Sequence, residues 1–234
     1  MITTVIFDMY ETLITQYASP LYFGAQISAD MGISEENFYR LRDPLDEACA
    51  TGQLTFEDMI AQILNEYGIY SDELLKKISD KRSAAKRECF RHLHSQIIPM
   101  LEELKSRKLK IGLISNCFSE EIPAIRESEI FPYFDAVCLS YEEGVRKPNK
   151  EIYMRCIDRL SVEASECLYV GDGGSHELEA ARELGMTALQ AVWYLNLKEP
   201  WQTSRKEDFI QLESPMDLFN FLSSYTQNHS VHII

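Results

Sequence analysis

The stretch TVIFDMYETL, residues 4–13, decides the fold, because a buried strand pattern runs directly into a polar loop. We expect a strand at Thr3–Phe7 and four later strands at Lys110–Ser115, Ala136–Ser140, Cys167–Gly171 and Ala188–Trp193. A stretch with helical periodicity precedes each of the later four. Strands that alternate with helices predict an α/β fold with a doubly wound, Rossmann-like parallel sheet covered on both faces.

One long segment interrupts this alternation. From about Ser19 to about His94 there is no strand pattern, only amphipathic helical stretches at Leu21–Met31, Glu35–Ala50, Phe56–Tyr67 and Asp72–Cys89. Ser34, Thr55 and either Ser71 or Asp72 are the expected N-caps. The segment is too long for an ordinary connection and predicts an all-helical cap. We therefore expect residues 1–18 and 95–234 to form a catalytic core, with residues 19–94 inserted as the cap.

Composition narrows the classes of function. The chain has 234 residues, of which 45% are hydrophobic, and a net charge of -14. Such a charge repels nucleic acid and anionic membrane, so neither is an expected partner. The six cysteines form no C-x-x-C pair, which favours buried free thiols in a reducing compartment. With neither a signal peptide nor an apolar run long enough to span a bilayer, we expect a cytoplasmic protein.

Polar residues follow four of the five predicted strands, at the places where parallel strands present ligands. They are Asp8–Leu13, Ser115–Asn116, Arg146–Pro148, and Gly171–Gly174 with Glu177 shortly after. A single Asp after a strand is usually a turn residue. Four polar groups that converge on one edge of a sheet are more simply explained by an active site.

The residue types at this edge suit an anionic substrate. Asp8 and Asp172 would lie close together, and two such carboxylates repel each other unless a cation sits between them. Mg²⁺ is the usual hard cation for oxygen ligands. Lys147 adds a second positive charge and can orient Asp8, while Ser115 and Asn116 can hold a phosphoryl oxygen.

Four segments, FDMYETL, ISN, VRKPNKEIY and VGDGGSHELEAARELGM, resemble the motifs of the haloacid dehalogenase superfamily of hydrolases in order and spacing. The resemblance covers nearly the whole chain and is to the subgroup with a helical cap after the first strand (subfamily I, C1 cap). It implies that Asp8 is a nucleophile that forms an aspartyl-phosphate. Ser115 would bind phosphate, and Lys147 would hold both nucleophile and phosphate. Asp172 would bind Mg²⁺ with Asp8, and Glu177 would support the ion through water or a neighbouring ligand.

Tyr10 departs from this pattern, because most phosphatases of the superfamily have an acid/base Asp at this position, two residues after the nucleophile. A phenol has a pKa of about 10 and is a poor base at neutral pH. Tyr10 could still donate a proton, shape the pocket or bind Mg²⁺ through its carbonyl, and Glu11 is a nearby substitute. Loss of a positioned acid/base typically costs ~10² to 10⁴ in rate, least for substrates with good leaving groups such as acyl phosphates.

Three functions remain open at this point. The first is a Mg²⁺-dependent hydrolase of a small phosphorylated metabolite. The second is a metal-free 2-haloacid dehalogenase, since such enzymes also resemble this chain at F-D-x-Y-x-T-L, although they lack the Asp found here at Asp172. The third is a weakly active or regulatory binding protein. Arg40 and Arg42, the turn at Gly52–Leu54, and the aromatic residues Trp193, Tyr194 and Trp201 are further candidates for the substrate cleft, with surface or packing roles as the alternative.

Overall fold

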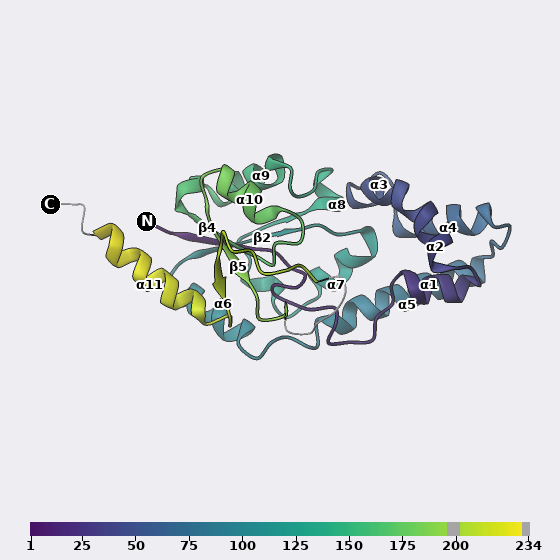
Figure 1. Ribbon diagram of the computed structural model, residues 1–234, viewed down its shortest axis with the longest axis horizontal. Coiled ribbons are helices and arrows are strands. Elements are labelled where there is room, and N and C mark those ends of the chain that lie inside the picture. The colour runs from purple at the N-terminus through teal and green to yellow at the C-terminus, as the bar shows by residue number, and fades with distance from the viewer. Residues whose placement is uncertain (196–201, 231–234) are drawn as a thin grey trace.

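The computed structural model describes residues 1–195 and 202–230 of the chain. Its centre is a sheet of six parallel strands in the order β3-β2-β1-β4-β5-β6 (Figure 1). The strands are β1 (Thr4–Phe7), β2 (Lys110–Ser115), β3 (Ala136–Leu139), β4 (Cys167–Gly171), β5 (Thr187–Ala191) and β6 (Ile210–Leu212). The predicted parallel α/β sheet is thus confirmed. The edge strand β6 was missed, because three residues carry too little pattern to be recognised.

Apolar side chains fill both faces of the sheet. Val5 and Phe7 of β1 pack into one core, whereas Ile6 between them packs into the other. Successive residues of a strand point to opposite faces, so the continuous apolar run of β1 is explained by burial on both sides. Around the sheet lie α6 (Ile97–Ser106), α7 (Ile122–Arg126), α8 (Ser140–Glu143), α9 (Lys150–Leu160), α10 (Glu177–Glu183) and α11 (Asp217–Ser230). We call this part the sheet lobe.

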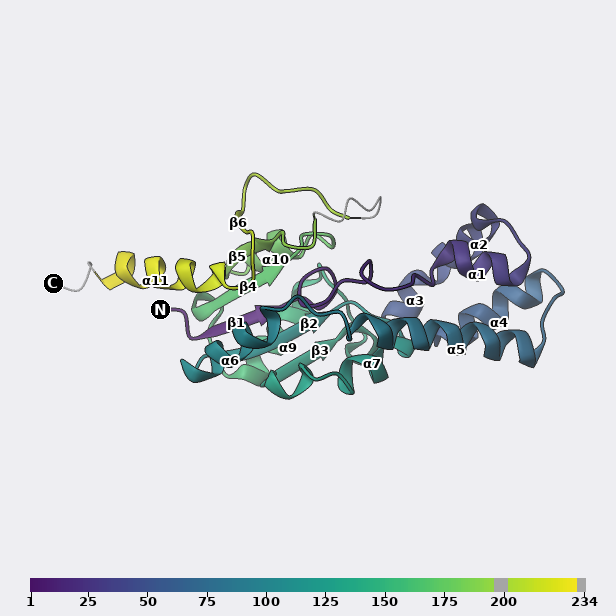
Figure 2. The same ribbon diagram turned by 90° about the horizontal axis from the view of Figure 1, so that it is seen from below.

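Five helices between β1 and α6 form a second body, here called the helical lobe. They are α1 (Gly24–Met31), α2 (Glu35–Arg42), α3 (Asp46–Ala50), α4 (Phe56–Glu66) and α5 (Asp72–Cys89). Their apolar faces enclose a core of their own. The lobe projects from one end of the molecule, as Figure 2 shows from below.

Local sequence explains the helix boundaries in this lobe. The side chains of Ser34, Thr55 and Ser71 each accept a hydrogen bond from the backbone N–H three residues later, which confirms the three predicted N-caps. The helix expected over Glu35–Ala50 is interrupted instead by the 3₁₀ turn η1 (Asp43–Leu45), where Pro44 lacks the N–H needed to continue an α-helix.

Two features of the composition can be followed in the structure. All six cysteines are buried and free of disulfides. In the described part of the chain, no helix has the length and apolar character needed to cross a membrane.

Polar contacts dock the two lobes where α5 meets the 3₁₀ turn η2 (Ser119–Glu121), which follows β2. Arg82 pairs with Glu120 at 3.0 Å, and Lys86 pairs with Glu121. Nearby, the Phe56 N–H of α4 donates to Ser119 Oγ at 2.8 Å. The helical lobe is therefore fixed to the loop that leaves the end of β2, which carries Ser115.

Candidate active site

The register of the central strands brings the predicted site residues to one edge. Phe7 at the end of β1 lies beside Leu113 of β2 and Val170 of β4. Asp8, Ser115 and Asp172 follow these residues by one or two positions, so all three emerge at the carboxyl end of the sheet. Oxygen atoms of Asp8, Asp172 and Glu177 lie within 4.8 Å of one another, and all three residues are buried.

Asp8 is held by one buried cation. Lys147 Nζ lies 2.5 Å from Asp8 Oδ1, and the lysine side chain is only 1% exposed. The Met9 N–H donates to the same oxygen at 2.7 Å. Burial raises the pKa of Asp8, while Lys147 acts in the opposite direction. Both of these contacts fall on Oδ1 of the Asp8 carboxylate.

Asp172 lies on a tightly bonded loop. Glu177 accepts hydrogen bonds from the N–H groups of Gly173 at 2.6 Å and Ser175 at 2.7 Å, so its carboxylate shapes this loop. Gln190 of β5 donates to the Asp172 carbonyl oxygen at 2.8 Å. The pKa of Asp172 is raised well above its ordinary value by burial and by the negative charges of Glu177 and Asp8.

This donor set is suited to a hard divalent cation. Three buried carboxylates face one ammonium group, which leaves the cluster short of positive charge. An oxygen-only set of this kind fits Mg²⁺ better than a soft metal. A cation here would relieve the repulsion that raises the pKa of Asp172.

Asn116 is tied to Lys147 in both directions. Its Oδ1 accepts from the Lys147 N–H at 2.8 Å, and its Nδ2 donates to the Lys147 carbonyl at 3.1 Å. The amide therefore fixes the backbone that carries the lysine. Ser115 is fully buried beside it, and its hydroxyl donates to the Asn116 carbonyl at a long 3.4 Å. The structure thus brings both residues to the site, and their contact with substrate remains a prediction.

Tyr10 turns its ring toward the helical lobe. The Lys86 ammonium lies 4.7 Å from the centre of that ring, and the buried Tyr10 hydroxyl has no hydrogen-bond partner among the described residues. Burial and the nearby Glu121 raise the pKa of Tyr10 well above 10, so the phenol stays neutral. Glu11 is engaged locally, because it accepts from the Thr15 hydroxyl and the Gln16 N–H.

Several supporting residues escaped the sequence analysis or were left undecided by it. The sequence analysis did not identify Tyr169, whose hydroxyl accepts from Lys147 Nζ at 3.5 Å, or Gln190. A buried Gln within an apolar strand is unusual and marks a polar contact that must be satisfied. Trp193 Nε1 donates to the Thr12 carbonyl at 2.8 Å, and the Tyr194 hydroxyl donates to the Leu13 carbonyl at 3.4 Å. These two aromatic residues therefore brace the loop that follows Asp8. Trp201 lies outside the described residues.

Comparison with known families agrees with this geometry. The family model described as haloacid dehalogenase-like hydrolase matches residues 2–185, a range that includes Asp8, Ser115, Lys147, Asp172 and Glu177. The chain belongs to the haloacid dehalogenase-like hydrolase family. The family resemblance predicted from the four sequence motifs is confirmed.

Relatives of this chain include enzymes that are named as phosphatases. The glyceraldehyde 3-phosphate phosphatase of Methanocaldococcus jannaschii is 26% identical over 82% of this chain and 86% of its own. The enzyme of the same name from Methanopyrus kandleri is 26% identical over 81% of this chain and 84% of its own. Among solved structures, a 2-haloacid dehalogenase from Pseudomonas syringae superposes with a TM-score of 0.69 at 19% identity, over 96% of this chain and 100% of its own. At that identity the likeness shows the shared fold alone.

Proposed function

We propose that this hydrolase is a Mg²⁺-dependent phosphatase that acts on a small phosphorylated substrate through Asp8. The observation that carries the proposal is the buried Asp8–Lys147 pair beside Asp172 and Glu177. The pair provides an oriented carboxylate, and the two further carboxylates provide a place for a cation. The names of the relatives in Methanocaldococcus jannaschii and Methanopyrus kandleri support phosphate as the group transferred.

In the proposed reaction, Asp8 Oδ2 attacks phosphorus as Lys147 holds the other carboxylate oxygen. The bond from phosphorus to the leaving oxygen breaks, and its electron pair departs with that oxygen. Water then hydrolyses the aspartyl-phosphate to release inorganic phosphate and restore Asp8. Ser115 would donate a hydrogen bond to a phosphoryl oxygen, with Asn116 keeping Lys147 in position. Asp8, Asp172 and the Tyr10 carbonyl would hold Mg²⁺, and the bound ion would supply positive charge that offsets the charge of the phosphate.

Tyr10 limits the leaving groups that this site can expel. Its buried phenol has a raised pKa and is a weak acid, so it gives little help to a departing alkoxide. Glu11 is committed to Thr15 and Gln16. We therefore expect the best substrates to have leaving groups that are stable as anions, such as acyl phosphates and activated phosphate esters.

The helical lobe would serve as the cap. We propose that residues 19–94 cover the catalytic edge, as the docking of α5 and α4 onto the loop after β2 supports. A cover of this kind excludes water from the attacking carboxylate and from the phosphorus.

The test is a panel of acetyl phosphate, an activated aryl phosphate and 2-chloropropionate, each with Mg²⁺ and with chelator. We expect phosphate release that requires Mg²⁺ and is abolished in Asp8→Asn. Asp80→Asn, which changes an exposed α5 carboxylate in the same way, is the matched control and should keep full activity. Halide release that persists in the presence of chelator would refute the proposal. If the folded protein hydrolyses none of the three compounds, a binding role would be favoured.

The two relatives described above, each aligned over about four fifths of the chain, are named as phosphatases and lend no support to the dehalogenase alternative. Asp172 and Glu177 also place two further carboxylates beside Asp8, where they would hinder a metal-free nucleophile.

A further inference from the structure

Gln190 lies between two apolar residues of β5 and is fully buried. Its Nε2 donates to the Asp172 carbonyl at 2.8 Å and to the Ser204 carbonyl at 2.9 Å. Its Oε1 accepts from the Lys206 N–H at 2.8 Å. A buried amide without such partners would be costly, whereas an apolar side chain of similar size would need none. The amide therefore joins three segments that are separate in the chain: β5, the loop that carries Asp172, and residues 204–206.

The loop that carries Asp172, residues 171–175, has little rigidity of its own. Three of its five residues are glycine, which loses more conformational freedom on ordering than any other residue. Gly173 has a φ of +94°, in the left-handed region. Glu177 accepts from the Gly173 N–H, and Gln190 donates to the Asp172 carbonyl. The position of the Asp172 carboxylate therefore depends on contacts from outside the loop.

Lys206 lies against the backbone of the same loop. A Cβ at Gly173 would lie 2.6 Å from Lys206 Cε and 3.0 Å from its Cδ, so the lysine stem is in direct contact with this glycine. Lys206 Nζ also pairs with Glu179 of α10 at 2.6 Å, which holds the stem in place. The preceding residue, Arg205, instead donates to Glu213 at 2.8 Å, and both of these side chains are exposed. Of these two adjacent residues, Lys206 is therefore the one that packs on the Asp172 loop.

We propose that Gln190 and Lys206 are positioning residues for the cation site, because they keep the Asp172 carboxylate beside Asp8. This inference rests on the proposed function, which places Mg²⁺ there. Both residues act through the loop backbone, Gln190 at the Asp172 carbonyl and Lys206 at Gly173. Loss of a partner that orients a metal ligand typically lowers metal affinity by ~10–100-fold.

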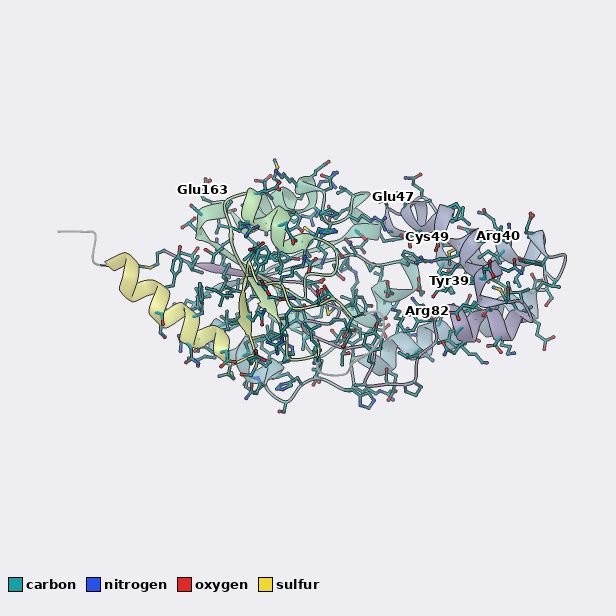
Figure 3. The ribbon with its side chains drawn as sticks, in the orientation of Figure 1. Tyr39, Arg40, Glu47, Cys49, Arg82 and Glu163 are labelled. Atoms are coloured by element: carbon teal, nitrogen blue, oxygen red, sulfur yellow. The ribbon has the colours of Figure 1, made fainter. Side chains whose placement is uncertain are left out.

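The first test is titration of the metal-free full chain with Mg²⁺ alone, followed by calorimetry. Gln190→Met and Lys206→Ala should each raise the Kd for Mg²⁺ by about tenfold or more. Their matched controls, Gln62→Met and Arg205→Ala, should leave it unchanged. Gln62 is exposed and lines a hollow of the helical lobe together with Arg40, which Figure 3 labels far from β5. If Gln190 served stability alone, Gln190→Met would lower Tm and leave the Kd unaltered.

The second test follows phosphate release from acetyl phosphate as Mg²⁺ is varied. Gln190→Met should need about tenfold more Mg²⁺ for half of its maximal rate. At saturating Mg²⁺ it should regain most of the wild-type kcat, because the occupied site holds Asp172 in place. A kcat that stays low at saturating Mg²⁺, with an unchanged Mg²⁺ requirement, would contradict a positioning role.

The outcomes separate this inference from the function on which it rests. Mg²⁺ binding by the wild type that is equally tight in folded Gln190→Met and Lys206→Ala would overturn the inference and leave the phosphatase function standing. If Gln190→Met fails to fold, the comparison of Lys206→Ala with Arg205→Ala decides alone. Weakened Mg²⁺ binding in the variants, without phosphate release from any compound by the wild type, would refute the phosphatase function and retain the positioning role. A folded wild type that binds no Mg²⁺ would overturn both.

Discussion

The buried ion pair between Arg82 and Glu120 offers a quantitative test of how the two lobes are joined. The side chains are 11% and 1% exposed, and one carboxylate oxygen of Glu120 has no partner among the described residues. Arg82→Met keeps an apolar stem but leaves Glu120 buried next to Glu121. Removing one partner of a buried pair typically costs ~3–5 kcal/mol, because the other charge stays desolvated. We expect a loss of that size in the free energy of unfolding.

The assay is urea unfolding at pH 7, with Lys76→Met as control. Lys76 lies on the same helix at 2.6 Å from Asp80, but these side chains are 74% and 65% exposed. An exposed pair is worth about 0–1 kcal/mol, so the control should lose little. The double variant Arg82→Met, Glu120→Gln removes the stranded charge and should be more stable than Arg82→Met alone.

The pH dependence has a definite sign. Burial already raises the pKa of Glu120, and Arg82 opposes that rise. Without Arg82 the pKa rises further, so native Glu120 binds a proton that the unfolded chain has lost. The deficit of Arg82→Met should therefore grow as pH rises above the ordinary pKa of a glutamate and shrink as pH falls. A deficit below 1 kcal/mol, or one equal at pH 5 and pH 8, would refute the reasoning.

Three further predictions concern the site and its cover. Mg²⁺ at a hundred times its Kd should stabilise the protein by about 2.7 kcal/mol. The increase in Tm that Mg²⁺ causes, measured by calorimetry, should be larger at pH 8 than at pH 5. The reason is that protons compete with the ion for Asp172, whose pKa is raised. An increase that is equal at the two pH values, or larger at pH 5, would argue against Asp172 as a ligand of the ion. Asn116→Ala loses both hydrogen bonds to the Lys147 backbone and should lower kcat about tenfold or more, with an unchanged circular dichroism spectrum. An unaltered kcat would show that these two hydrogen bonds are not needed to position Lys147. Gly52→Ala should speed tryptic cleavage of the helical lobe and lower stability by more than the ~1–2 kcal/mol of a positive φ, because its Cβ would meet the Tyr141 carbonyl oxygen at 2.2 Å. Gly68→Ala, with φ +64° and open space, is the control, and equal losses in the two variants would disprove the contact.

The sequence predicted the sheet well, since burial on both faces leaves continuous apolar runs such as those of β1 and β2. It also located three N-caps, because a capping side chain bonds a backbone N–H only three residues away. It could not place β6, whose three residues pair only with β5 at an edge. Nor could it locate the break at Pro44, where an otherwise helical pattern continues on both sides.

For the candidate site, the sequence alone determined which residues reach the carboxyl edge of the sheet, because strand ends fix where Asp8, Ser115 and Asp172 emerge. Only the tertiary structure decided their partners. The Asn116 amide is held by the Lys147 backbone, 31 residues away in the chain, and the Tyr10 ring lies beneath Lys86 of the helical lobe. Such contacts depend on how separate elements pack, and no local pattern encodes them.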